Sequence, residues 1–106
     1  MARQASVFYN GILAGTLTKA KGEFIFTYDE IYLASRRPAI ALTLPKRQEP
    51  YKSKELFPFF EGLLPEGENR RLYCMSLKID PKDSYRLLLK LARNETIGAI
   101  TVMEDV

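Results

Sequence analysis

The chain of 106 residues has no histidine and a single cysteine, Cys74. Without histidine it lacks the most frequent general base of enzymes and a frequent ligand of transition metals. One cysteine excludes an internal disulfide and a thiolate cluster for zinc. We therefore expect no metal site, no cofactor and no catalytic residues. Cys74 has apolar neighbours, and we expect it to be a small buried hydrophobic residue.

Nucleotide-binding and kinase motifs are also missing. Gly11 and Gly15 do not begin a G-x-G-x-x-G fingerprint, and no phosphate loop, His-Arg-Asp or Asp-Phe-Gly string occurs. Glu66 and Glu68 lie close together, but an acidic pair at the start of a helix more often complements the helix dipole than performs acid–base catalysis. The chain by itself is predicted not to be an enzyme.

Long apolar runs are absent as well. No segment is long enough to span a membrane, and the N-terminus, "MARQASVFYN", lacks the apolar core of a signal peptide. We therefore expect a cytoplasmic protein. With 46% hydrophobic and 27% charged residues, the composition is that of a folded protein, and the length predicts one domain over residues 1–106. The net charge of +3 is too small to indicate nucleic-acid binding by itself.

The first third of the chain has the pattern of β-strands. Asn10-Gly11 is a strong hairpin signal, because both central residues of that turn need positive φ. Aromatic residues alternate with other residues in "EFIFTY", as in a strand with one buried face. We predict a three-stranded antiparallel meander. Its strands and turns are residues 5–9, Asn10-Gly11, 12–18, Lys21-Gly22 and 23–28.

The segment between the meander and the helical half is harder to interpret. Residues 29–37 predict one helical turn followed by a loop. Residues 39–44, "AIALTL", predict a short strand that ends at Pro45. A polar loop with two prolines then leads to Ser53, which we expect to cap the next helix.

Three helices are predicted after this loop. The first begins near Lys54 and ends at Pro65 and Gly67; Pro58 lies in its first turn, where the missing N–H costs little. Its apolar stripe is Phe57, Phe60 and Leu64, which we expect to be core. The second helix covers residues 68–77, with Leu72 and Met75 as candidate inward residues.

Start and stop signals define the third helix. Asp80 is the expected cap, Pro81 the first helical residue, and Asn94 the residue that ends the helix. Leu87, Leu88 and Leu91 are expected to point toward the core. Residues 96–103, "TIGAITVM", predict a last strand. The fold class is α+β, an antiparallel sheet (the meander plus the late strand) covered on one face by about three helices.

Two surface features are candidates for function. A basic stripe along the third helix is a solvated face, or else a contact for acidic protein or nucleic-acid phosphates. The second is the rigid polar turn "LLPEGENRR", a reasonable recognition element between two helices. The stripe consists of Lys82, Arg86, Lys90 and Arg93. The turn residues predicted to bind a partner are Leu64, Pro65, Glu66, Gly67, Glu68, Asn69, Arg70 and Arg71.

The string "SKELFPFFEGLLPEGENRRL" resembles the N-terminal subdomain of the HipA family of bacterial Ser/Thr kinase toxins. The segments "VFYNGILAGTLT", "FIFTYD", "LTLP" and "DSYRLLLKLARNETIGAITV" fit the same subdomain in the same order, so the resemblance covers about nine-tenths of the chain. In the family this subdomain leads into a kinase core, whereas this chain stops at Val106 without a kinase motif. It therefore resembles the split arrangement, HipBST, in which the subdomain is a separate small protein, HipS.

The resemblance implies partners rather than chemistry. It implies that the protein is an antitoxin-like subunit that binds and neutralises a shortened HipA-like kinase, HipT, together with a HipB-like DNA-binding protein, through which alone it would reach DNA. In related small subunits a tryptophan tends to follow Pro-Glu-Gly and acts as a wedge, whereas this chain has Glu68 there. Two other interpretations stay open: a structural adaptor that completes the kinase or bridges it to the DNA-binding protein without inhibiting it, and a nucleic-acid binder that uses the basic stripe.

Overall fold

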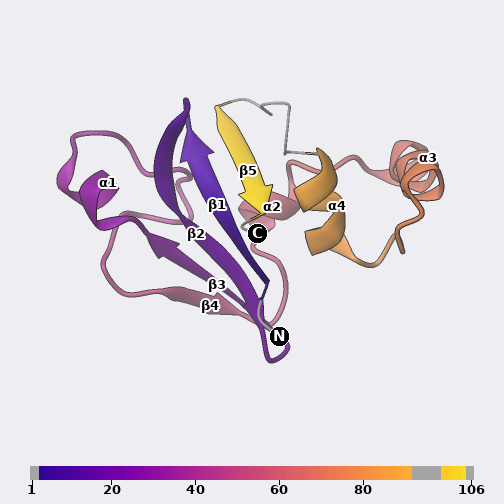
Figure 1. Ribbon diagram of the computed structural model, residues 1–106, viewed down its shortest axis with the longest axis horizontal. Coiled ribbons are helices and arrows are strands. Elements are labelled where there is room, and N and C mark those ends of the chain that lie inside the picture. Colours follow the sequence, from indigo (N-terminus) through magenta and orange to yellow (C-terminus); the bar gives the residue numbers. More distant parts are fainter. Residues whose placement is uncertain (1–2, 92–98, 105–106) are drawn as a thin grey trace.

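The computed structural model describes residues 3–91 and 99–104, which form a five-stranded antiparallel sheet with helices (Figure 1). The order of the strands across the sheet is β4-β3-β2-β1-β5. This confirms the predicted α+β class, the meander and the late strand. The strands are β1 (Arg3–Tyr9), β2 (Ile12–Ala20), β3 (Glu23–Tyr28), β4 (Tyr51–Ser53) and β5 (Ile100–Glu104).

The two turns of the meander have the geometry that their sequences require. Asn10 and Gly11 have φ of 50° and 80°, and Lys21 and Gly22 have 52° and 77°. Paired positive φ angles give the turn a twist that matches the two strands that it joins. The sequence therefore determines both hairpins locally.

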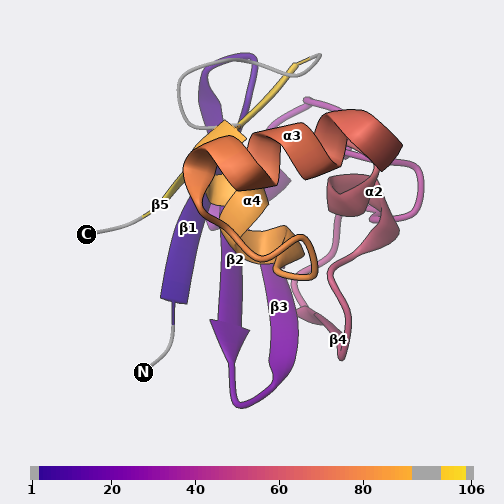
Figure 2. The ribbon, with the colours of Figure 1, turned by 90° about the vertical axis from the view of Figure 1, so that its right-hand side faces the viewer.

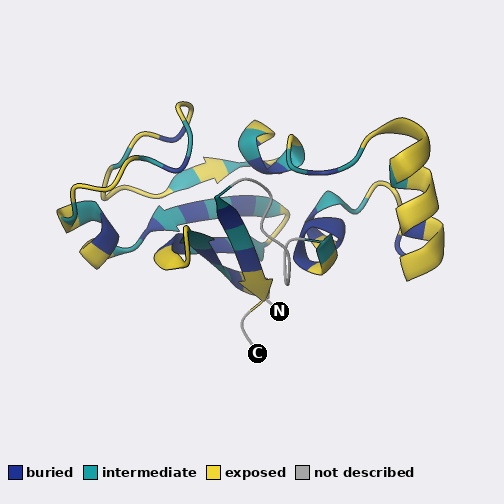
Figure 3. Cartoon of the chain, turned by 90° about the horizontal axis from the view of Figure 1, so that it is seen from above, coloured by how far each residue is buried: buried dark blue, intermediate teal, exposed yellow. Residues whose placement is uncertain are grey.

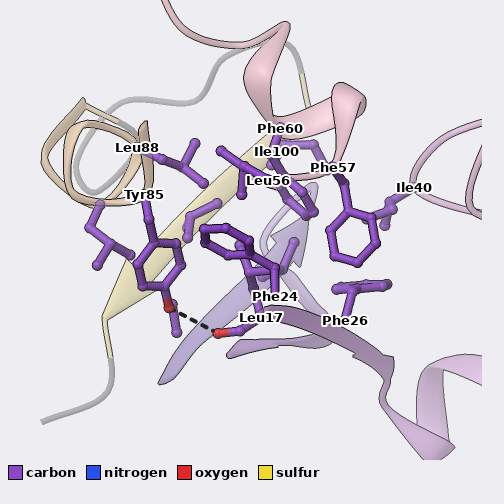
Figure 4. Packing of buried hydrophobic residues seen from close by; sticks show 14 of the residues in the cluster. Leu17, Phe24, Phe26, Ile40, Leu56, Phe57, Phe60, Tyr85, Leu88 and Ile100 are labelled. Carbon is purple, nitrogen blue, oxygen red and sulfur yellow. Dashed lines mark hydrogen bonds between the residues drawn. The ribbon is translucent and has the colours of Figure 1, made fainter. Parts of the chain in front are cut away.

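One face of the sheet carries the hydrophobic core. Phe24, Phe26 and Tyr28 alternate inward along β3, as predicted. The ring of Phe26 lies 5.9 Å from that of Phe60 in α2 (Pro58–Glu61), and the ring of Phe24 lies 5.6 Å from that of Tyr85 in α4 (Ser84–Leu91) (Figure 4). Both helices therefore pack on the same face of the sheet. The helices are α1 (Glu30–Ala34), α2 (Pro58–Glu61), α3 (Gly67–Leu77) and α4 (Ser84–Leu91).

The predicted strand over residues 39–44 is wrong. These residues form a loop with one isolated bridge between Ala41 and Leu44, and the fourth strand is instead β4, which pairs with Phe24–Phe26. The hydroxyl of Tyr28 explains the loop, because it donates to the carbonyl of Leu44 and accepts the N–H of Ile40 at 3.1 Å. A buried side chain thus satisfies backbone groups that a strand would pair with a neighbouring strand.

Two predicted helix starts are also corrected. The side chain of Ser53 accepts the N–H of Glu55 at 3.2 Å, but this closes a turn, and α2 begins only at Pro58. Asp80 likewise accepts the N–H of Lys82 in a separate turn. The cap of α4 is Asp83, whose Oδ1 accepts the N–H of Arg86 at 3.1 Å. Each predicted cap therefore accepts a backbone N–H, but each helix begins later in the chain than predicted.

Some of the other predictions in this region are confirmed, and some concern residues that the structure does not describe. Leu87 and Leu88 are buried and Leu91 packs against the core, as expected. Asn94 and residues 96–98 lie outside the described residues. Within the described part of the chain, no helix is long and apolar enough to cross a membrane.

Candidate functional site

The apolar and the polar half of the segment 55–71 have separate places in the structure. Phe57 and Phe60 are buried over the sheet, and Leu64 has only 5% of its surface exposed. Pro58 is the first residue of α2, as its missing N–H favours. The phenylalanine stripe is thus core, as predicted, and Leu64 anchors the following turn from inside.

The turn between α2 and α3 presents polar residues to solvent. Glu66, Glu68 and Asn69 are all exposed, and Pro65 is half-buried. Gly67 has φ of +58° and is the first residue of α3, whereas the sequence predicted that it ends the preceding helix. A left-handed residue at this position reverses the chain sharply, and glycine adopts it without the steric penalty that a Cβ brings.

Arg70 does not point into solvent with its neighbours. Its Nη1 donates to Glu61 Oε1 at 3.0 Å, its Nη2 donates to Ser84 Oγ at 2.9 Å, and Nη2 and Nε both donate to the carbonyl of Pro81. The hydroxyl of Ser84 also donates to Glu61 at 3.1 Å. One guanidinium therefore joins α2, α3 and the start of α4, which fits its planar set of donors.

Glu68 and Arg71 form an exposed ion pair one turn apart on α3. Arg71 Nε donates to Glu68 Oε2 at 3.0 Å, and its Nη1 lies 3.1 Å from the sulfur of Met75. The hydrogen bond from Arg71 lowers the pKa of the Glu68 carboxyl, and the same bond raises the pKa of Arg71. Both groups stay charged at neutral pH, so this side of α3 has a positive and a negative group that cancel.

The helix α3 exposes apolar side chains that the sequence placed inside. Leu72 and Met75 were expected to face the core, but 51% and 64% of their surfaces are exposed, so that expectation is wrong. Tyr73 and Leu77 are exposed as well. Cys74 is the buried residue of α3, as predicted. Figure 1 places α3 at the opposite end of the molecule from α1, and Figure 3 shows that almost all of it is exposed.

The reason lies in the tertiary arrangement of the helices. Figure 2 shows α3 lying in front of α4, and Figure 1 shows that α3 lies farther from the sheet than α4 or α2. Because α4 and α2 cover the core, α3 contacts the body of the protein along a narrow strip that includes Cys74 and Arg70. The sequence contained a signal for this: the apolar residues at 72, 73, 75 and 77 do not lie on one side of a helix, as those of a helix that docks on a core do.

The described residues of the basic stripe lie on α4 and in the turn that precedes it. Lys82 lies in the turn before α4, where it lines an open groove of about 700 Å³ with Lys19 and Lys54. Arg86 and Lys90 are exposed on α4 itself, and neither lines this groove. Arg93 lies outside the described residues. No described carboxylate forms an ion pair with Lys82, Arg86 or Lys90. Exposed cations without an ion-pair partner are those of a solvated face.

The described residues do not assemble a centre for metal chemistry. Among them, no three His, Cys, Asp or Glu side chains lie close enough to hold a metal ion. Cys74 is buried. Two carboxylates near the turn are bound by arginines, Glu61 by Arg70 and Glu68 by Arg71. The fold and the site thus define a small α+β domain whose third helix carries exposed apolar residues beside a charged pair.

Comparison with known proteins identifies the family. Residues 5–103 match the model of the HipA N-terminal domain, and the chain belongs to this family. A solved structure described as the N-terminal domain of HipA toxin superposes with a TM-score of 0.76 at 30% identity, covering 98% of this chain and 93% of that one. The resemblance and the fold expected from it are confirmed.

Relatives of two different lengths share the sequence. A protein of Haemophilus influenzae, described as uncharacterized, is 32% identical over 99% of this chain and 95% of its own length. A protein of Sinorhizobium fredii named "Putative kinase Y4mE" is 31% identical over 97% of this chain, but the match spans only 25% of that protein. The domain therefore occurs both as nearly a whole protein and as a quarter of a longer one.

Proposed function

We propose that this protein is an antitoxin-like subunit that binds a HipA-like Ser/Thr kinase, HipT, and holds it inactive. The observation that carries the proposal is the pair of lengths at which the domain occurs. It accounts for a quarter of Y4mE, a protein named as a kinase, and for nearly all of the Haemophilus influenzae relative. A domain that can be covalently joined to a kinase-type chain, or separate from it, is suited to associate with such a chain non-covalently.

The exposed part of the α2–α3 turn is the surface that we propose for this contact. Pro65 and Gly67 fix its path, and Glu66, Glu68 and Asn69 project from it. Leu64 in the core and Arg70 in its network support the turn from behind, and Arg71 borders it. A recognition turn with a rigid base loses little conformational entropy when it binds.

Neutralisation requires more than binding. A subunit inhibits only if it binds the inactive conformation of the kinase more tightly than the active one. We propose that docking near the nucleotide-covering loop favours a conformation that does not align ATP, and that a HipB-like DNA-binding protein completes the complex. A subunit of this kind works with its kinase in the cytoplasm and has no catalytic centre of its own.

The test combines the purified protein with the HipA-like kinase encoded next to it. Autophosphorylation of the kinase is followed while the subunit is raised to saturation, with and without the HipB-like protein. Loss of phosphorylation supports the proposal. Full activity in a complex that has demonstrably formed would remove the inhibitor function and leave an adaptor, whereas the absence of a complex would remove both.

The genomic context provides a second test. A neighbouring gene for a kinase that lacks this domain is the arrangement that the proposal expects. A reading frame that continues from this chain into a kinase would mean that the domain regulates its own polypeptide, and the separate-subunit proposal would then be abandoned.

A further inference from the structure

The outward face of α3 is an apolar surface that no described part of the chain covers. Leu72 and Met75 are three residues apart and therefore lie on the same side of the helix. Glu68, four residues before Leu72, continues this side toward the start of the helix. Contiguous exposed apolar residues with a polar border are typical of interaction sites.

The charged pair gives this face a defined edge. Arg71 holds Glu68 with two donors and also contacts the sulfur of Met75, so ion pair and apolar residues form one continuous surface. Because the two charges cancel, the face is apolar and neutral, with polar groups on one side only. Its complement is an apolar lining with polar groups at one rim.

The size of α3 decides between two kinds of occupant. Its 11 residues form a helix of roughly 16 Å at 1.5 Å per residue. Two copies that paired only through such a helix would bury far less than the roughly 800 Å² per partner of a stable interface. A groove that surrounds the helix on several sides covers more of it, as when an amphipathic helix binds in a hydrophobic groove.

We propose that the outward face of α3, formed by Leu72 and Met75 and bordered by the Glu68–Arg71 pair, binds in an apolar groove of the HipA-like kinase. This inference rests on the proposed function, and it names Leu72 and Met75 as the apolar anchor of the contact with the kinase. It is supported by Y4mE, in which this domain is accompanied by three times its own length of further chain. That protein has ample chain to enclose a projecting helix.

The experiment compares two double variants of the full chain for binding to the purified neighbouring kinase by calorimetry. Leu72→Ala with Met75→Ala removes the anchor. Ile31→Ala with Leu42→Ala is the matched control, because these aliphatic residues are 82% and 100% exposed outside α3. Circular dichroism and urea unfolding verify that both variants fold. We expect the α3 variant to raise Kd tenfold or more, as loss of an interface anchor does, and the control to change it by about twofold or less.

The other outcomes are distinct. If the α3 variant binds with wild-type affinity, the inference is overturned while the proposed function stands. If only the control loses affinity, the inference is likewise overturned, and the contact lies near α1 instead. If the wild type does not bind the kinase, the proposed function fails. Self-association by sedimentation that the α3 variant abolishes would make a second copy the occupant and overturn the inference as well.

Discussion

Arg70 and the carbonyl oxygen of Pro81 are joined by two hydrogen bonds, from Nη2 at 2.7 Å and from Nε at 3.0 Å. A guanidinium can donate twice to one acceptor because its N–H groups form a planar fork. This contact, together with Glu61 and Ser84, fixes the start of α3 against the rest of the protein. The α2–α3 turn and the exposed helix α3 are therefore held by a residue that is largely buried, with 18% of its side chain exposed.

Replacing Arg70 is expected to destabilise the fold more than replacing its neighbour. Arg70→Ala removes a charged donor from Glu61, Ser84 and Pro81. Hydrogen bonds to charged groups contribute at most roughly 3 kcal/mol, the contributions within one network are not additive, and solvent screens the exposed Glu61. We expect a total loss of about 1–3 kcal/mol in the free energy of unfolding, measured in urea. Arg70→Lys keeps the charge without the fork and should fall between Arg70→Ala and the wild type.

Arg71→Ala is the control for that measurement. Arg71 lies next to Arg70 but is exposed, and exposed ion pairs contribute little to stability. Equal losses in the two alanine variants would mean that the Arg70 network does not hold α3.

Two glycines are expected to resist substitution for different reasons. A Cβ at Gly15 would lie 2.4 Å from the carbonyl oxygen of Thr27 and 2.9 Å from the ring of Phe26, so Gly15→Ala forces β2 and β3 apart. Overpacking of this kind costs roughly 1–3 kcal/mol, and a clash with backbone belongs at the upper end. Gly67 has open space around it, and only its φ of +58° opposes a side chain, at a cost of about 1 kcal/mol.

A second substitution at Gly67 separates conformation from crowding. Asparagine adopts the left-handed region more readily than alanine does. Gly67→Asn should therefore lose less stability in urea than Gly67→Ala. If the larger asparagine costs more than alanine, space rather than φ limits this position.

The Glu68–Arg71 pair predicts a pH dependence at acid pH. Because the folded pKa of Glu68 is lowered from its ordinary value of 4.5, the pair stabilises the folded state fully above 4.5. That contribution is lost as the pH falls through the lowered pKa. An NMR titration of the Glu68 side chain should give a midpoint below 4.5.

A variant pair assigns this shift to its cause. Arg71→Ala should raise the midpoint of Glu68 toward 4.5, since it removes the hydrogen bond responsible for the shift. Lys90→Ala, which removes an exposed cation from α4, should leave the midpoint unchanged. An unchanged midpoint in Arg71→Ala would show that the ion pair does not persist in solution.

Local features of the sequence predicted much of the fold. Asn10-Gly11 specifies its turn, the alternation in 23–28 specifies the inward face of β3, and the start of α3 was predicted to within one residue. Residues 39–44 have strand-like composition as well, yet the edge of β3 is taken by 51–53 and Tyr28 holds the earlier segment as a loop. Composition alone does not reveal which of two segments reaches a sheet edge.

In the candidate site, too, local features were predictable from the sequence and contacts between distant residues were not. The position and polarity of the turn at Pro65–Asn69 could be predicted, because proline and glycine act on their own backbone. The inward role of Arg70 depends on Glu61, Pro81 and Ser84, which are 9 to 14 residues away. Such partners meet only when α2, α3 and α4 are packed.

By itself the sequence determined the hairpin turns, the strand alternation and the family resemblance, since each depends on neighbouring residues or on a contiguous motif. Only the tertiary structure decided that Leu72 and Met75 are exposed. Whether an apolar side chain on a helix is buried depends on which elements already cover the core, and in this protein α2 and α4 do so and leave the outer side of α3 uncovered.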